Sequence, residues 1–166
     1  MSRRGQAEPA SGWNRVISLP SVQVWLHLVF STRNREALLQ SDPFREEMFR
    51  MLCQQVQECG CIPQFAGGSV DHVHLVCGLS RTVTIAKLVD HVKTETARWA
   101  HTAHGLSGFA WQSGYGVFSV SQSRLDQVID YVAAQENYHR WQSYQEEFRE
   151  LCEKHTIEID ERTAWD

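Results

Sequence analysis

Two histidines separated by a single residue carry the strongest chemical signal in the sequence. They lie in the segment Asp-His-Val-His-Leu at residues 71–75. On a β-strand, residues i and i+2 point to the same face about 6.6 Å apart, so His72 and His74 can bind one metal ion. The intervening apolar residues then face the helices. Two strand histidines without any chemical role would give the same pattern.

A His-x-His pair also occurs in amidohydrolases and in histidine-triad hydrolases. An amidohydrolase barrel needs roughly 250 residues, and this chain has 166. The histidine triad needs a third alternating histidine, and position 76 is valine. Both enzyme classes are therefore excluded.

A tyrosine and a glutamine one helical turn apart form the second signal. Tyr131 and Gln135 are an i, i+4 pair and share one side of a predicted helix. Its apolar stripe consists of Leu125, Val128, Ile129 and Val132. Tyr131 lies about 110° from the centre of this stripe and Gln135 about 70°. A tyrosine used only for packing is expected on the stripe. We therefore expect Tyr131→Phe to cost no more than about 0.5 kcal/mol of stability, although a plain surface tyrosine also fits this position.

The elements that must position these residues follow from the periodicity of apolar side chains. Alternation predicts strands near 22–30, 61–65, 72–79 and 109–120. Helical spacing and capping signals predict helices near 42–59, 84–104 and from 123 to beyond 138. The stretch 156–166 is expected to form a short strand or arm.

The order β-α-β-β-α-β followed by a helix predicts an α+β fold of the ferredoxin-like or RRM-like type. In this fold an antiparallel sheet carries two helices on one face, and the other face is left for a site or a partner. Residues 1–20 are polar and are expected to be a flexible leader. Residues 21–166 are expected to form one catalytic domain.

Composition narrows the cellular setting. No apolar run approaches the ~20 residues of a membrane span, and the five cysteines show no paired metal spacing. We therefore expect a cytoplasmic protein. The net charge is −4, but the last 31 residues hold nine acidic and four basic residues. The remainder is nearly neutral, so charge does not exclude a nucleic-acid partner.

Three ordered motifs together resemble the HUH single-tyrosine transposases, a bacterial family of insertion-sequence and REP-associated enzymes. They are the segment at 71–75, Trp-Gln-Ser-Gly-Tyr-Gly-Val-Phe-Ser-Val-Ser at 111–121, and Tyr-Val-Ala-Ala-Gln-Glu-Asn-Tyr-His at 131–139. Further likeness lies at 27–35, at 67–68, at Lys93 and at 157–162. Two departures are the leader, which has no counterpart, and Ala134, where asparagine is frequent.

The resemblance implies a role for each matching residue. His72 and His74 correspond to the metal-binding pair, Gln135 to the third ligand and Tyr131 to the nucleophile. It also implies cleavage and rejoining of single-stranded DNA with Mg²⁺ or Mn²⁺ through a 5′-phosphotyrosine. The expected protein is a homodimer that recognises DNA hairpins.

Basic residues are the expected contacts to DNA phosphates, because cationic side chains supply most sequence-independent affinity. We assign this role to Arg33, Arg35 and Lys93. Tyr115 and Tyr138 are rival nucleophiles, of which Tyr115 lies in a Gly-Tyr-Gly bend. A non-catalytic module that binds single-stranded nucleic acid on the same sheet remains the alternative function. A nicking enzyme of replication or conjugation would bring a larger chain.

Overall fold

A computed structural model describes residues 23–165 of the chain. The predicted leader at 1–20 lies outside these residues. The strands are β1 (Trp25–Ser31), β2 (Ile62–Gly68), β3 (His72–Gly78) and β4 (Gly116–Val120). The helices are α1 (Asp42–Glu58), α2 (Ile85–His104), α3 (Leu125–Ala133), α4 (Gln135–Tyr138) and α5 (Tyr144–Lys154), with short 3₁₀ turns at Arg33–Arg35 and Gln122–Arg124.

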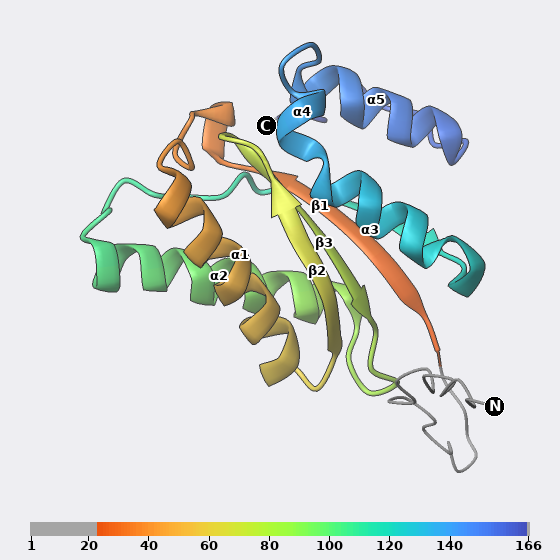
Figure 1. The fold of residues 1–166 in the computed structure, drawn as a ribbon, viewed down its shortest axis with the longest axis horizontal. Helices are drawn as coiled ribbons and strands as arrows, with labels where there is room; N and C mark the ends of the chain where they lie inside the picture. The colour runs from red at the N-terminus through yellow and green to blue at the C-terminus, as the bar shows by residue number, and fades with distance from the viewer. Residues whose placement is uncertain (1–22, 166) are drawn as a thin grey trace, which may run out of the picture.

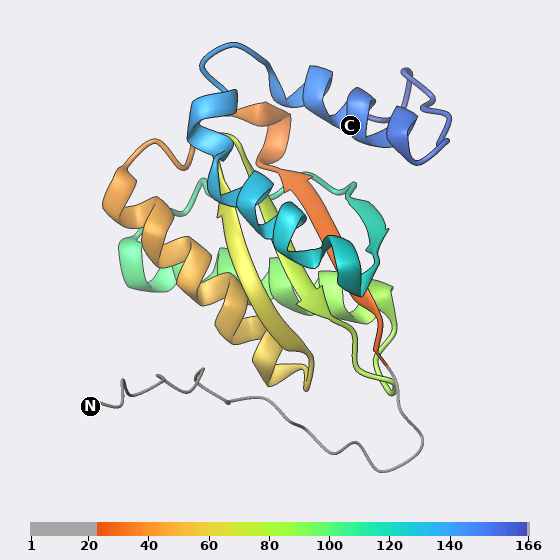
Figure 2. The same ribbon diagram turned by 45° about the vertical axis from the view of Figure 1, so that its right-hand side comes forward.

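The four strands form one antiparallel sheet in the order β2-β3-β1-β4. Helices α1 and α2 cover one face, and α3 crosses the other (Figures 1 and 2). This is the split β-α-β arrangement expected from the order of elements. The prediction of an α+β, ferredoxin-like fold is confirmed.

Along each strand, successive side chains point to opposite faces of the sheet. Leu26, Leu28 and Phe30 of β1 join the core under α1 and α2, as do Val73 and Leu75 of β3. The residues between them point the other way. As predicted from parity, His72 and His74 therefore leave the sheet on the face opposite α1 and α2.

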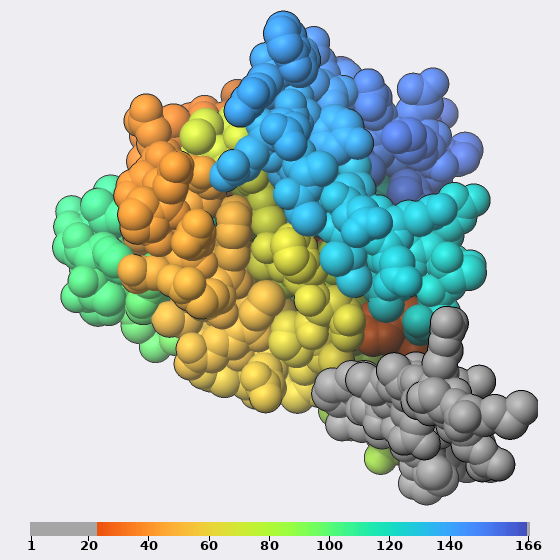
Figure 3. All heavy atoms as spheres, in the orientation of Figure 1, coloured from red at the N-terminus to blue at the C-terminus, as the bar shows by residue number. Residues whose placement is uncertain are grey.

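This second face is not open, contrary to the expectation from sequence. The apolar stripe of α3 packs on it, with Leu125 and Val132 buried against Trp25 and Val76. Helix α5 adds a second cluster beside β4, formed by Val29, Phe118, Tyr144, Leu151 and Cys152. Both histidines are consequently fully buried. In the space-filling view the chain after residue 125 forms a thick layer along one side of the molecule (Figure 3).

Three predicted elements need correction. The helix expected from 123 to beyond 138 is broken at Ala134, whose φ and ψ of −91° and 6° lie outside the α-helical range. The strand expected at 109–120 is regular only over β4, with an isolated bridge between Thr32 and Trp111. Of the short strand or arm expected at 156–166, the strand is absent: residues 157–160 have no regular structure and 161–165 form turns.

Helix α5 was not predicted. Its N-terminus is fixed by a capping box in which the Ser143 hydroxyl accepts from the Glu146 N–H, and the Glu146 carboxylate accepts from the Ser143 N–H. Tyr144, Leu151 and Cys152 then form its buried side. The helix is thus specified locally and held to the sheet by apolar contacts.

No helix in the described part of the chain is both long and apolar enough to cross a membrane.

Candidate active site

The two strand histidines lie side by side in a buried polar pocket between the sheet and the C-terminal helices. The rings of His72 and His74 are 5.1 Å apart between centroids. In each ring, Nδ1 contacts a residue that lies outside this pair. His72 Nδ1 is 2.7 Å from the Asp71 carboxylate, and His74 Nδ1 is 2.8 Å from Nε2 of His27. Both Nε2 atoms therefore face the centre of the pocket.

A third histidine reaches the same point from the C-terminal side. His139, directly after α4, lies with its ring 4.3 Å from that of His72. Its Nδ1 is 2.7 Å from the Gln142 carbonyl oxygen, so this ring is also held by Nδ1 with Nε2 turned inward.

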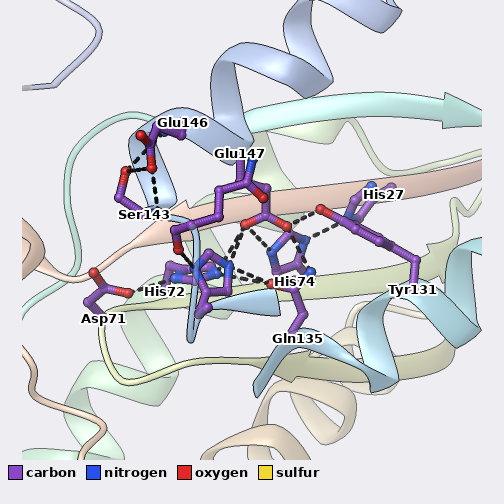
Figure 4. Close-up of polar contacts among 11 residues, drawn as sticks. His27, Asp71, His72, His74, Tyr131, Gln135, Ser143, Glu146 and Glu147 are labelled. Carbon is purple, nitrogen blue, oxygen red and sulfur yellow. Dashed lines mark hydrogen bonds and ion pairs between the residues drawn. The ribbon is translucent and has the colours of Figure 1, made fainter. Parts of the chain in front are cut away.

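A carboxylate from α5 occupies the centre of the three rings. Glu147 is 2% exposed. Its Oε2 lies 2.7 Å from Nε2 of His139 and 3.4 Å from Nε2 of both His72 and His74. Such a buried anion requires compensating positive charge, and Figure 4 shows the histidines gathered around it.

Gln135 and Tyr131 close the pocket from α4 and α3. The Gln135 side-chain oxygen is 3.2 Å from His72 Nε2 and 2.9 Å from His139 Nε2. Its amide nitrogen donates to Glu147 Oε1 at 2.7 Å. The Tyr131 hydroxyl donates a hydrogen bond to the same Oε1. The break at Ala134 directs Gln135 into the interior, where it is 1% exposed.

Charge and burial shift the pKa values of Glu147 and His72 in opposite directions. Burial alone raises the pKa of Glu147, but hydrogen bonds from the three histidines outweigh it and hold the pKa far below its usual value. Burial lowers the pKa of His72, yet Asp71 and Glu147 overcome this and raise it to about 9. Without a metal, the pocket therefore pairs an anionic Glu147 with a protonated His72.

Three further groups have pKa values shifted towards their neutral forms. Burial lowers the pKa of His74 and, together with His74, that of His27. Burial and the nearby Glu147 carboxylate raise the pKa of the Tyr131 hydroxyl. As long as Glu147 is an anion beside it, the phenol remains protonated.

The donor set fits a divalent cation. His74 Nε2 is buried, and its contact within the described residues is the long one to Glu147 Oε2 at 3.4 Å, which leaves the nitrogen weakly satisfied. One ligand atom each from His72, His74, His139 and Glu147 falls within 4.8 Å of the others. Imidazole and carboxylate are usual ligands for transition metals.

The structure thus brings together four residues singled out from sequence: His72, His74, Tyr131 and Gln135. The rival tyrosines are more exposed: Tyr115 is 42% and Tyr138 47% exposed, although the ring of Tyr138 packs 5.4 Å from that of Tyr131. Trp111 and Phe118 belong to the apolar clusters.

The predicted phosphate contacts do not share the pocket. Arg33 is exposed on the turn after β1, and Arg35 donates to the Trp165 carbonyl oxygen. Lys93 on α2 donates to the carbonyls of Gln112 and Gly114, at 2.8 and 2.7 Å. Its ammonium thus fastens the segment before β4, and burial lowers its pKa to about 8.

His139 and Glu147 are not among the site residues predicted from sequence. Both follow the Tyr131–Gln135 pair, in the stretch whose acidity suggested only a charged tail. A signal was present in the Ser143-Tyr-Gln-Glu146 capping box, which marks a helix start. The apolar positions after it place Glu147 on the buried side, where an isolated acid indicates a functional site.

Comparison with known proteins gives a consistent result. The family model "Transposase IS200 like" matches residues 21–135. A search of curated proteins found no significant match. The structure of a proposed transposase from Deinococcus radiodurans R1 superposes with a TM-score of 0.54 and 22% identity, covering 70% of this chain and 93% of that one.

A REP-associated tyrosine transposase bound to a REP hairpin superposes with a TM-score of 0.54 and 16% identity, covering 72% of this chain and 70% of that one. At these identities the two structures establish a shared fold. The family match spans well over half of the residues and includes His72, His74, Tyr131 and Gln135. The chain belongs to the family of IS200-like transposases.

Proposed function

We propose that the protein cleaves and rejoins single-stranded DNA, with Tyr131 as nucleophile and a divalent metal held by His72, His74 and Gln135. The observation that carries this proposal is the convergence of two strand histidines, a glutamine and a tyrosine from separate elements on one buried point (Figure 4). A packing role does not explain why two buried imidazoles, an amide and a tyrosine hydroxyl gather around one carboxylate.

In the proposed reaction the Tyr131 oxygen attacks the scissile phosphorus. A bond forms between that oxygen and phosphorus, the bond from phosphorus to the 3′-oxygen breaks, and the phenolic proton ends on the freed 3′-hydroxyl. The 5′-phosphotyrosine keeps the energy of the broken phosphodiester, so attack by a 3′-hydroxyl rejoins strands without ATP. A bound Mg²⁺ or Mn²⁺ supplies Lewis-acid polarisation of the phosphate.

The chain's own residues prepare this step. Asp71 and His27 orient the two strand histidines through Nδ1, a recurrent way of fixing metal-binding imidazoles. The carboxylate of Glu147 orients the Tyr131 hydroxyl. The ring of Tyr131 lies 5.8 Å from that of His74, which keeps the nucleophile beside the metal-binding nitrogen.

We further propose that residues 21–166 form the catalytic domain, that it acts as a homodimer, and that it recognises DNA hairpins. Hairpin binding is supported by the fold shared with a REP-associated transposase bound to a REP hairpin. Arg33, on the exposed turn after β1, and Arg35 are the proposed phosphate contacts, with Lys93 positioning the segment 112–114.

A covalent adduct is the decisive test. Incubation with single-stranded DNA and Mn²⁺ is expected to give a denaturation-resistant complex attached to the 5′ side of the cut. Tyr131→Phe abolishes it, whereas the matched control Tyr138→Phe, on an exposed residue, retains it. Cleavage without an adduct would replace the mechanism by metal-activated hydrolysis. If the protein binds DNA but does not cleave it with any divalent metal ion, the non-catalytic alternative is favoured.

Oligomeric state is tested separately by sedimentation at micromolar concentration, with and without hairpin DNA. A dimer in either condition supports the proposal. A strict monomer in both rejects it.

A further inference from the structure

We infer that His139 and Glu147, which lie beyond the family match at residues 21–135, are metal ligands in this protein. This inference rests on the proposed function, because it concerns the same site. The segment after Gln135 then contributes as many ligands as the sheet does: an imidazole and a carboxylate added to the imidazoles of His72 and His74.

The three histidines share an arrangement that is typical of metal-binding imidazoles. Each has Nδ1 engaged by an outer partner: Asp71 for His72, His27 for His74, and the Gln142 carbonyl for His139. Each turns Nε2 towards the others. Metal-binding histidines are oriented in this way, with the second ring nitrogen held by a neighbouring group. The ring of His139 is therefore oriented for metal binding in the same way as the rings of the two strand histidines.

Glu147 supplies the negative charge that a cation in this pocket needs. Its Oε2 is within 3.4 Å of all three Nε2 atoms. The four ligand atoms fall within 4.8 Å of one another, close to the ~4 Å between two ligands across one ion with bonds of 2.0–2.2 Å. A buried carboxylate is expensive unless paired or bound to a metal.

The position of Glu147 is fixed by its helix rather than by a flexible arm. It lies in the first turn of α5, next to the capping box of Ser143 and Glu146. Tyr144 and Leu151, which precede and follow Glu147, are buried in the cluster beside β4. Figure 4 shows the carboxylate extending from α5 towards the histidines. A side chain anchored on both sides is pre-organised to bind.

Gln135 connects the two halves of this ligand set. Its oxygen faces Nε2 of His72 and His139 while its nitrogen donates to Glu147. In the larger set Gln135 either binds the ion through its oxygen or holds Glu147 in position through its nitrogen. In both cases His139 and Glu147 remain ligands.

Mn²⁺ binding to the full chain tests the inference without relying on activity. Electron spin-echo spectroscopy of the wild-type complex is expected to show three coupled imidazole nitrogens, falling to two in His139→Ala. Calorimetry should show Mn²⁺ affinity reduced by more than about 100-fold in Glu147→Ala and in His139→Ala, since loss of even an outer partner costs 10–100-fold.

Matched controls remove the same charge or ring outside the pocket. Glu150→Gln lies on the exposed side of α5, and His104→Ala lies at the end of α2. Both should bind Mn²⁺ like the wild type. The wild-type spectrum keeps the inference testable even if a variant fails to fold.

The outcomes separate the inference from the proposed function. Two imidazoles in the wild type, or unchanged affinity in folded Glu147→Ala and His139→Ala, overturn the inference while Tyr131 chemistry at His72 and His74 stands. Absence of any Mn²⁺ binding, with and without single-stranded DNA, overturns both.

Discussion

Removing the hydroxyl of Tyr131 should destabilise the metal-free protein measurably. The hydroxyl donates to a buried carboxylate, Glu147, and hydrogen bonds to charged groups contribute about 1.5–3 kcal/mol. Glu147 Oε1 keeps a second bond, from Gln135 Nε2 at 2.7 Å, so the anion is not left without a partner. We therefore expect Tyr131→Phe to cost about 1.5–2 kcal/mol, near the lower end of that range.

Equilibrium unfolding in urea measures this cost directly. For a chain of this size 1 kcal/mol corresponds to about 2–4 °C in Tm, so Tm should fall by roughly 3–8 °C. Phenylalanine retains the ring contacts with Tyr138 and His74, at 5.4 and 5.8 Å between centroids. The measured loss therefore reports on the hydroxyl.

Tyr138→Phe is the matched control. Tyr138 is 47% exposed, and its change should stay within about 0.5 kcal/mol. Equal stabilities of the two variants would show that the hydrogen bond to Glu147 contributes nothing. The smaller loss of stability that the sequence predicts for Tyr131→Phe would then be correct.

Three further changes test how the site is supported. In Gly67→Ala the new Cβ would lie 2.7 Å from the Val132 carbonyl oxygen, so α3 must shift. Urea unfolding should show a loss of about 1–3 kcal/mol in the free energy of unfolding. The control Gly108→Ala should lose little, because its new Cβ meets nothing within 4 Å. Ser143→Ala removes the cap of α5 and should cost about 1 kcal/mol; an unchanged Mn²⁺ affinity would show that α5 needs no cap to place its carboxylate. Burial raises the pKa of the Cys77 thiol to about 12, so native protein should resist alkylation at this site at pH 8. The pKa of this thiol is higher in the folded protein than its unfolded value of 9.0, so the stability that its protonated form contributes is complete below pH 9 and declines as pH rises towards 12. Rapid alkylation of Cys77 in the native protein would contradict its burial.

The fold and the strand half of the site could be predicted because local patterns specify them. Alternation alone assigns His72 and His74 to one sheet face and Val73 and Leu75 to the other, and the order of elements selects the sheet topology. The structure agrees on each of these points. Such features depend on neighbouring residues and need no knowledge of distant contacts.

The C-terminal half of the site depends on tertiary packing. Helical periodicity predicts a continuous helix through Gln135, but contacts with His72, His139 and Glu147 favour a break at Ala134. The alternation of side chains along β3 places His72 and His74 on the sheet face opposite α1 and α2. It does not reveal that α3 and α5 cover that face. No sequence spacing brings Glu147 to His74, because 73 residues of chain must fold before they meet.

The division of the pocket between the sheet and α5 has a consequence for synthesis. A ribosome makes the chain from its N-terminus, and all four strands are complete at Val120, before Tyr131, Gln135, His139 or Glu147 has been added. A nascent chain can thus form its sheet while the nucleophile and half of the inferred ligands do not yet exist. Under the inferred assignment of ligands, the complete ligand set therefore exists only after α5 has docked on the sheet.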